Sequence, residues 1–307
     1  MDGSLEITPK ILVGICAYNE ERRIGSCLER VLDGHHSFHI LVIASGCTDS
    51  TADVVKRIAC MDQRVELVEE GTRNGKAKAL GEILRRFASE KYDWLVILSA
   101  DSKPSKDAVH RLVSYADLNN LDVCSGMPLA DDRGEPRLIK RAASLLWKIH
   151  NNFISCASSR LLPHCTDELL CVRKGVLNGI PPDVVNDGAY ISVVAKTHGL
   201  KVGFCSSAIT LTSVPKNLAE LTKQRARILL GHILLRKRTG YWSNTVESSL
   251  LNSPSLSFSA LRKSIRERPD ILAFTMLLIV ECQAMLLAFG WYIKRGKPWI
   301  WRKVVTE

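Results

Sequence analysis

Short apolar runs alternate with segments of helical periodicity through the first 130 residues. Five apolar runs predict buried strands: 11–17, 40–44, 65–68, 94–98 and 123–126. Between them, apolar residues spaced three and four apart predict four helices: 20–32, 51–59, 76–87 and 107–118. Strands and helices that alternate at this period form parallel sheets with right-handed crossovers. We therefore expect an α/β fold with a doubly wound, mostly parallel sheet and flanking helices.

The alternation loosens after residue 130. Further helices are predicted over 138–154, 187–197 and 218–238, and further strands over 169–172 and 202–204. We divide the α/β domain, 1–214, into two halves: 1–127 and 128–214. The rest is predicted to be a basic amphipathic helix, a Ser-rich linker, a hydrophobic helix and a basic tail: 215–245, 246–270, 271–293 and 294–307.

Residues 271–293 are almost wholly apolar. As a helix the segment would extend about 34 Å, enough for the ~30 Å hydrocarbon core of a bilayer. Glu281 and Gln283 interrupt it, and a carboxylate at mid-bilayer costs about 3 kcal/mol, against about −0.5 kcal/mol for each Leu or Ile. A spanning helix, a re-entrant hairpin and a buried core helix all stay open. Cations flank both ends, so they do not choose an orientation.

Charge separates the front of the chain from its back. Residues 1–214 hold 26 Lys and Arg against 26 Asp and Glu, whereas residues 215–307 hold 16 against 6. A basic segment that also carries the apolar run favours a membrane surface over nucleic acid as partner. The first ten residues lack a basic segment followed by an apolar one, and the ten cysteines are scattered. We expect free thiols and a location on the cytoplasmic face of a membrane.

The apolar run over 94–98 is followed by Ser99 and Ala100 and then by a lone carboxylate, Asp101. In open α/β sheets, ligands bind beyond the carboxyl ends of the strands. A carboxylate there can hold Mg²⁺ or Mn²⁺, which in turn neutralises a diphosphate. The alternative is that Asp101 only begins a turn, a common role of Asp.

Three more polar segments follow predicted strands, so four should meet at one edge of the sheet. They are Ala17-Tyr18-Asn19-Glu20, Ser45-Gly46-Cys47-Thr48-Asp49, Arg73-Asn74-Gly75-Lys76 and Ser99-Ala100-Asp101. In this order and spacing the chain resembles the family-2 glycosyltransferases, which are inverting, nucleotide-sugar-dependent enzymes of GT-A fold. The resemblance covers about residues 8 to 230 and implies that 1–127 binds nucleotide sugar and metal and 128–214 the acceptor.

The resemblance implies a donor site at these strand ends. Its residues would be Ala17, Tyr18, Asn19, Glu20, Ser45, Arg73, Lys76, Ser99 and Asp101. Arg73 and Lys76 would contact the diphosphate or the base, and Asp101 would bind the metal. The loop that contains Ser45 lacks the leading acids that are usual in the family, one of which pairs with the nucleotide base. The usual preference for uridine is therefore not carried over.

The second half of the resemblance concerns transfer itself. Asn186-Asp187 stands where the family has its catalytic Glu-Asp, so Asp187 would remove the acceptor's proton; its alternative role is a helix N-cap. Gln224, Arg225 and Arg227 imitate the Gln-x-x-Arg-Trp landmark without its aromatic residue. Either arginine would stabilise the leaving group, or both would only make a helix surface basic. Four residues lie where the family builds its acceptor pocket, and the resemblance assigns them no individual roles: Asp167, Glu168, Cys171 and Arg173.

These observations lead to a membrane-associated, metal-dependent glycosyltransferase that moves a sugar from a nucleotide-diphosphate donor to an acceptor hydroxyl, with a lipid-linked acceptor as the suited class. The alternative is a non-catalytic, membrane-bound scaffold that keeps the fold. A sugar nucleotidyltransferase ranks lower, because no Gly-rich loop follows the first strand. The leading hypothesis requires Asp101 and Asp187 to face one crevice, and neither to be enclosed in an ion pair.

Overall fold

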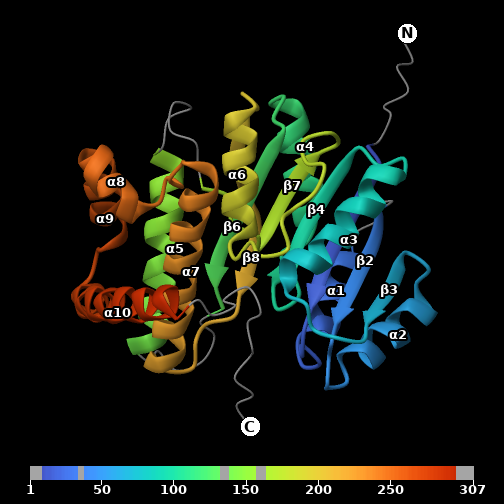
Figure 1. Cartoon of the computed structure of the whole chain (residues 1–307), viewed down its shortest axis with the longest axis horizontal. Helices are drawn as coiled ribbons and strands as arrows, with labels where there is room; N and C mark the ends of the chain where they lie inside the picture. Colours follow the sequence, from blue (N-terminus) through green and yellow to red (C-terminus); the bar gives the residue numbers. More distant parts are fainter. Residues whose placement is uncertain (1–8, 34–37, 132–137, 157–163, 295–307) are drawn as a thin grey trace.

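The computed structural model describes residues 9–33, 38–131, 138–156 and 164–294. Within these ranges eight strands form one sheet, in the order β3-β2-β1-β4-β7-β6-β8-β5. Helices cover both faces of the sheet, and the helices of the C-terminal part gather beside its second half (Figure 1). The predicted α/β fold is confirmed.

The first half of the sheet is parallel. Its strands are β1 (Ile11–Ala17), β2 (Phe38–Ser45), β3 (Val65–Glu70) and β4 (Trp94–Ser99). They alternate with α1 (Ile24–Leu32), α2 (Thr51–Met61), α3 (Lys76–Ser89) and α4 (Ala108–Leu118). β1 pairs in parallel with both β2 and β4, so all four strands end at the same edge. The helix expected over 20–32 starts only at Ile24, because a turn precedes it.

The second half of the sheet is mixed. It contains β6 (Val123–Ala130), β7 (Leu169–Arg173), β8 (Val202–Thr212) and the short β5 (Lys103–Pro104), with the helices α5 (Leu138–Cys156) and α6 (Asp187–Thr197). β7 runs antiparallel to its neighbours β4 and β6, and β5 runs antiparallel to β8. The sheet is therefore less uniformly parallel than its apolar runs suggest, because a fully buried strand reads alike in either direction.

Two layers of apolar side chains cover the two faces of the sheet. Val96 and Leu98 of β4 point into the layer under α1 and α4, and Leu95 and Ile97 point into the layer under α3. All four side chains are buried. Burial on both faces explains why this strand is an unbroken apolar run. The strand end that carries Asp101 is thereby held by the core.

The C-terminal part is helical throughout its described length. It consists of α7 (Leu218–Thr239), α8 (Val246–Asn252), α9 (Pro254–Ser264) and α10 (Arg268–Ile293). The prediction of a linker over 246–270 is wrong, since α8 and α9 occupy most of this range. Thr245 and Ser248 form a capping box that starts α8, and Pro254 lies in the first turn of α9. The serines that suggested a linker cap helices and bond to backbone carbonyls, as Ser257 does to Val246.

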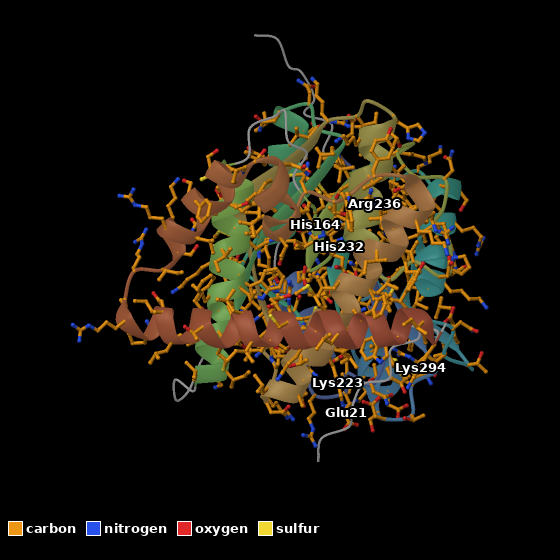
Figure 2. The ribbon with its side chains drawn as sticks, turned by 60° about the vertical axis from the view of Figure 1, so that its left-hand side comes forward. Glu21, His164, Lys223, His232, Arg236 and Lys294 are labelled. Carbon is orange, nitrogen blue, oxygen red and sulfur yellow. The ribbon has the colours of Figure 1, made fainter. Side chains whose placement is uncertain are left out.

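α10 packs along one side against α5 and α7 (Figure 2). Its buried side chains recur at helical spacing: Ala273, Leu277, Val280, Ala284 and Ala288. Its opposite side is exposed and apolar. Over the described residues, α10 is the one helix long and apolar enough to cross a membrane. It is not a buried core helix, and the basic tail from residue 295 lies outside the described residues.

Candidate active site

A cavity of about 1450 Å³ opens beyond the carboxyl ends of β1 and β4. It lies where the strand order diverges, with β2 on one side of β1 and β4 on the other, which is the usual ligand position in open α/β sheets. The helices α5, α6, α7, α8 and α10 contribute to the remaining walls. The wall contains most of the residues expected from the sequence: Ala17, Tyr18, Glu20, Ser45, Arg73, Lys76, Ser99, Asp101, Asp187, Gln224, Arg225 and Arg227.

The loops that follow β1, β2 and β3 are held together by close contacts. The Arg73 guanidinium lies 3.3 Å from the ring centroid of Tyr18. Gly46 has φ +60, and a Cβ there would lie 2.3 Å from the Arg73 nitrogen, so only glycine fits. Burial lowers the pKa of Arg73. Ser45 donates a hydrogen bond to Glu70. The two loops therefore present a cation and an aromatic ring to the cavity as one unit.

Asn19 differs from the expectation of a donor contact. Among the described residues that line the cavity, Asn19 is missing, although both its neighbours in sequence are present. It has a left-handed backbone with φ 53, and its side chain accepts a hydrogen bond from the Thr48 backbone at 2.9 Å and donates to the Thr48 hydroxyl at 3.1 Å. Asn19 thus ties the loop after β1 to the loop after β2.

Asp101 faces the cavity at the end of β4. The Arg23 Nη1 lies 3.5 Å from Asp101 Oδ2 and donates to Ser213 at 2.6 Å. Glu168 lines the same cavity; its Oε2 is buried without a hydrogen-bond partner in the described part of the chain. Burial and, to a smaller extent, the Asp101 charge raise the pKa of Glu168. A carboxylate pair of this kind fits a hard divalent cation that keeps waters and takes its other ligands from a diphosphate.

No group of three or more His, Cys, Asp or Glu side chains in the described ranges has the geometry of a metal site. The fit to Mg²⁺ or Mn²⁺ therefore depends on oxygen ligands brought by a substrate. This is the usual situation for Mg²⁺, which is bound through one or two carboxylates together with phosphates.

Asp187 lies at the first position of α6 and is only 3% exposed. Lys76, the first residue of α3, places its Nζ 3.0 Å from Asp187 Oδ2 and also pairs with Asp167. A Cβ on Gly188 would lie 2.5 Å from the Cys165 carbonyl oxygen, so the first turn of α6 packs closely against the loop that holds Asp167. Burial lowers the pKa of Lys76 and the Asp187 charge raises it; the net result is a raised pKa.

This geometry meets one requirement of the sequence hypothesis and not the other. Asp101 and Asp187 do line one cavity, but Asp187 is enclosed in an ion pair. Lys76, expected to contact the donor, is the counter-ion of the expected base. The N-cap position belongs to Asn186, so Asp187 does not have the alternative role of cap. Since the Lys76 ammonium lines the cavity as well, an incoming diphosphate has a cation within reach that can exchange partners.

The two arginines of α7 have different surroundings. Arg225 bonds to Glu281 of α10 and Glu247 of α8, and its side chain is 14% exposed. Burial lowers the pKa of Arg227, while the charges of Asp187 and Glu168 oppose that shift. Arg225 therefore joins three helices, and Arg227 is the arginine whose charge is directed at the acidic part of the cavity.

Arg23 and a row of three histidines line the cavity but were not predicted from the sequence as site residues. His150, His164 and His232 line the cavity, with ring centroids 5.8 and 5.2 Å apart along the row. Burial lowers the pKa of His150 and His232 to about 4, so both imidazoles are neutral near pH 7. One signal was available: His232 follows Gln224 by two steps of four residues on the same face of α7.

Asp167 and Glu168 also line the cavity, whereas Cys171 and Arg173 do not belong to its wall among the described residues. Cys171 is buried within β7. Arg173 stacks over Trp94 at 4.5 Å and bonds to Asp117 near the opposite end of the sheet. The acceptor pocket expected around these four residues is therefore reduced to the first two.

The eight-stranded α/β fold is that of a GT-A glycosyltransferase. The family model described as "Glycosyltransferase like family 2" matches residues 9–231. The chain belongs to this family, which confirms the family expected from the sequence.

Curated relatives match only part of the chain. The SPbeta prophage-derived glycosyltransferase SunS of Bacillus subtilis (strain 168) is 34% identical over 109 residues, which are 36% of this chain and 24% of that protein. Glycosyltransferase AglD of Haloferax volcanii is 27% identical over 138 residues, which are 43% of this chain and 22% of that protein. The matched segment thus spans less than a quarter of each of these two relatives.

Solved structures share the fold over nearly the whole chain. Mannosyltransferase PcManGT from Pyrobaculum calidifontis, solved with GDP-Man and Mn²⁺, superimposes with a TM-score of 0.60 at 22% identity and covers 96% of this chain and 83% of its own. S. aureus TarS 1-349 in complex with UDP gives a TM-score of 0.53 at 12% identity and covers 94% and 92%. At these identities the likeness concerns the fold.

Proposed function

We propose that this protein transfers a sugar, with inversion and with the help of Mg²⁺ or Mn²⁺, from a nucleotide-diphosphate donor to an acceptor hydroxyl. The observation that carries the proposal is that Asp101 and Asp187 face one cavity at the carboxyl ends of β1 and β4 in a chain of this family. Its volume of about 1450 Å³ accommodates a donor and an acceptor together.

The donor's diphosphate would lie near Asp101. When bound, the cation would neutralise the diphosphate and so weaken the bond to the sugar. Asp101 would hold it, with Glu168 beside it. Arg73 and Tyr18 would contact the nucleoside side of the donor, since they form one rigid unit at the neighbouring strand end. The complexes of PcManGT with GDP-Man and of TarS with UDP support a nucleotide-sugar donor, while the base and the sugar stay open.

Asp187 would accept the proton of the acceptor hydroxyl as its oxygen attacks the anomeric carbon from the side opposite the leaving diphosphate. The bond from that carbon to the diphosphate oxygen breaks, and the configuration at the carbon inverts. For this step Lys76 has to release Asp187. We propose that Lys76 turns to the diphosphate when the donor binds, which frees the Asp187 carboxylate to act as the base. Arg227 would stabilise the departing nucleoside diphosphate.

The acceptor proposed here is lipid-linked and reaches the enzyme at the cytoplasmic face of a membrane. Support comes from α10, whose exposed side is apolar and whose residues Phe274, Leu278 and Phe289 also line the cavity. A hydrophobic carrier could thus lie against α10 while its hydroxyl or sugar end enters the cavity.

The test is to replace Asp187 by Asn and to measure nucleotide release from GDP- and UDP-linked sugars in the presence of Mn²⁺ and a lipid extract. We expect turnover to fall about 10²–10⁴-fold, the contribution of a general base, with donor binding retained. Asp183→Asn is the matched control, because Asp183 is outside the cavity wall and pairs with Arg238. Unchanged turnover in Asp187→Asn would falsify the assignment of the base.

The non-catalytic scaffold is the second candidate, favoured by the ion pair between Lys76 and Asp187. Calorimetry separates the two. An enzyme of the proposed kind binds a nucleoside diphosphate more tightly with Mn²⁺ than without it, and Lys76→Met weakens that binding. A scaffold shows neither effect.

A further inference from the structure

The exposed side of α10 is a largely apolar surface, which we name the outer face. Eight of its side chains are large and apolar, each between 52% and 76% exposed: Ile271, Leu272, Leu278, Ile279, Met285, Leu286, Phe289 and Ile293. The smaller or polar residues Thr275, Cys282 and Gln283 are also exposed on this helix. The one charged residue in this segment, Glu281, points to the protein side. At 1.5 Å per residue the face extends about 34 Å. An uncharged surface of this length on a folded protein marks a binding surface.

The opposite side of α10 is attached to the protein along its whole length. At its beginning Asp270 bonds to Arg141 of α5 at 2.9 Å. In its middle Glu281 bonds to Arg225 of α7. Near its end the Tyr292 ring lies 5.8 Å from the Lys237 ammonium. Between these points, buried alanines of α10 pack against α7 and α5.

This attachment decides between the orientations that the sequence left open. If α10 stood across a bilayer, α5 and α7 would have to enter the hydrocarbon with it, because they contact it from the first turn to the last. α7 alone would carry Lys223, Arg227 and Lys237 into the membrane, at about 2.5–3.5 kcal/mol for each charge at the bilayer centre. With α10 in the membrane plane, only its outer face enters the apolar region.

The charges around the outer face match an anionic lipid surface. Arg266 precedes α10, Arg268 is its first residue, and Lys294 follows it. Lys223 and Arg236 of α7 lie on opposite sides of α10, and Lys294 lies at its end (Figure 2). A basic rim around an apolar face is typical of helices that lie in the headgroup region of anionic membranes. A second copy of the chain would bring an equal positive rim and be repelled.

We propose that α10 binds anionic bilayers as an in-plane helix, inserting its outer face without crossing the membrane. Leu278, Met285 and Phe289 belong both to the outer face and to the cavity wall, so the cavity then opens at the bilayer surface. This consequence rests on the function proposed above, whereas the binding mode does not.

Binding is tested with the full chain and vesicles of phosphatidylcholine, with and without phosphatidylserine. We expect binding to be at least tenfold tighter with phosphatidylserine and to weaken in high salt. Ile279→Asp with Leu286→Asp should reduce binding at least tenfold. Leu118→Asp is the matched control, because Leu118 is an exposed leucine at the end of α4. This variant should bind vesicles as the native chain does. If the double variant binds normally, or instead dissociates a dimer without affecting vesicle binding, the proposal is wrong.

The orientation is tested by depth. Leu272→Cys and Leu286→Cys, each in a chain with Cys60→Ser and Cys282→Ser, are labelled with a fluorophore and quenched by lipids spin-labelled at different depths. An in-plane helix places both probes at one shallow depth, about 5–10 Å below the headgroup boundary. A spanning helix separates the same two positions by about 21 Å along the bilayer normal. The second result would overturn the proposal.

These measurements are independent of catalysis. Asp187→Asn should bind vesicles as the native chain does while losing transfer. If transfer is absent in the native chain but vesicle binding and probe depths are as expected, the proposed function fails and the binding mode stands.

Discussion

The parallel half of the sheet and the helical layer formed by α7 and α10 hold their functional residues in different ways. Asp101 and Tyr18 directly follow strands whose side chains are buried on both faces, so the backbone alone fixes where they lie. In the helical layer, Arg225 joins α7 to α8 and α10 through two carboxylates. The strand-end residues are therefore positioned by the core of the sheet, whereas the helical layer is held by long-range ion pairs together with the apolar contacts of α10 with α5 and α7.

This difference has a functional consequence. If the strand ends bind the donor as proposed, the sheet core holds their residues independently of the contacts of the helical layer. The helical layer contributes Arg227 and His232 of α7 to the same cavity. Substitutions in the two regions should thus have separable effects.

The largest expected effect tests the core under the donor site. Leu98→Ala removes a side chain that is 1% exposed between β4 and its covering helices, and should lower the free energy of unfolding by about 2–5 kcal/mol. Leu286→Ala, at a side chain 76% exposed, should change it by less than about 0.5 kcal/mol. Urea unfolding of both variants in one buffer measures the difference. Equal losses would mean that the outer face is covered in solution.

The next effect concerns the chemistry of the donor half. Asp101→Asn keeps the shape of the side chain but removes its charge, so turnover should fall about 10²–10³-fold and Mn²⁺ should no longer strengthen donor binding. Asp53→Asn, at an exposed acid in the first turn of α2, serves as the control. Transfer rates with Mn²⁺ and with a chelator measure the effect. If Asp101→Asn kept its dependence on Mn²⁺, the cation would have to bind at residues other than Asp101.

The smallest effect is a pH dependence of the stability that arises from His232 of α7. Burial lowers the pKa of His232 to about 4 in the folded protein, against about 6.5 in the unfolded chain. Between these values the unfolded chain binds more protons, so the stability from neutral burial is complete above pH 6.5 and is lost as pH falls towards 4. Between pH 7 and pH 4.5 the free energy of unfolding of His232→Gln should fall by roughly 1–3 kcal/mol less than that of the native chain. Urea unfolding at a series of pH values measures this difference.

His198→Gln is the control for that series, because His198 is exposed at the end of α6. Identical slopes in the two variants would show that the acid sensitivity arises elsewhere, for example in the carboxylates of the cavity wall.

Much of the candidate site followed from local patterns. Strand ends are visible in a sequence because a buried strand is an apolar run and the polar residue after it marks the edge of the sheet. This placed Asp101, Tyr18 and Arg73 at one edge before any coordinates. The order of the family's landmarks added Asp187, whose position in the cavity wall agrees with that expectation.

The ion pair between Lys76 and Asp187 could not be predicted in the same way. Its partners are 111 positions apart in the sequence and meet only because α3 and α6 begin at the same wall of the cavity. The same holds for Arg23 beside Asp101 and for the row of histidines. The linker expected over 246–270 failed for a related reason: serine content describes a preference for caps and turns, and here the caps belong to α8 and α9.

By itself the sequence determined the α/β architecture, the edge at which chemistry gathers, and the length and apolar character of α10, because periodicity and composition are local properties of a chain. Only the tertiary structure decided which charges neutralise one another, that Arg225 joins helices while Arg227 faces the acids, and that one side of α10 is attached to α5 and α7. Those outcomes depend on contacts between residues far apart in sequence, whose energies no single segment contains.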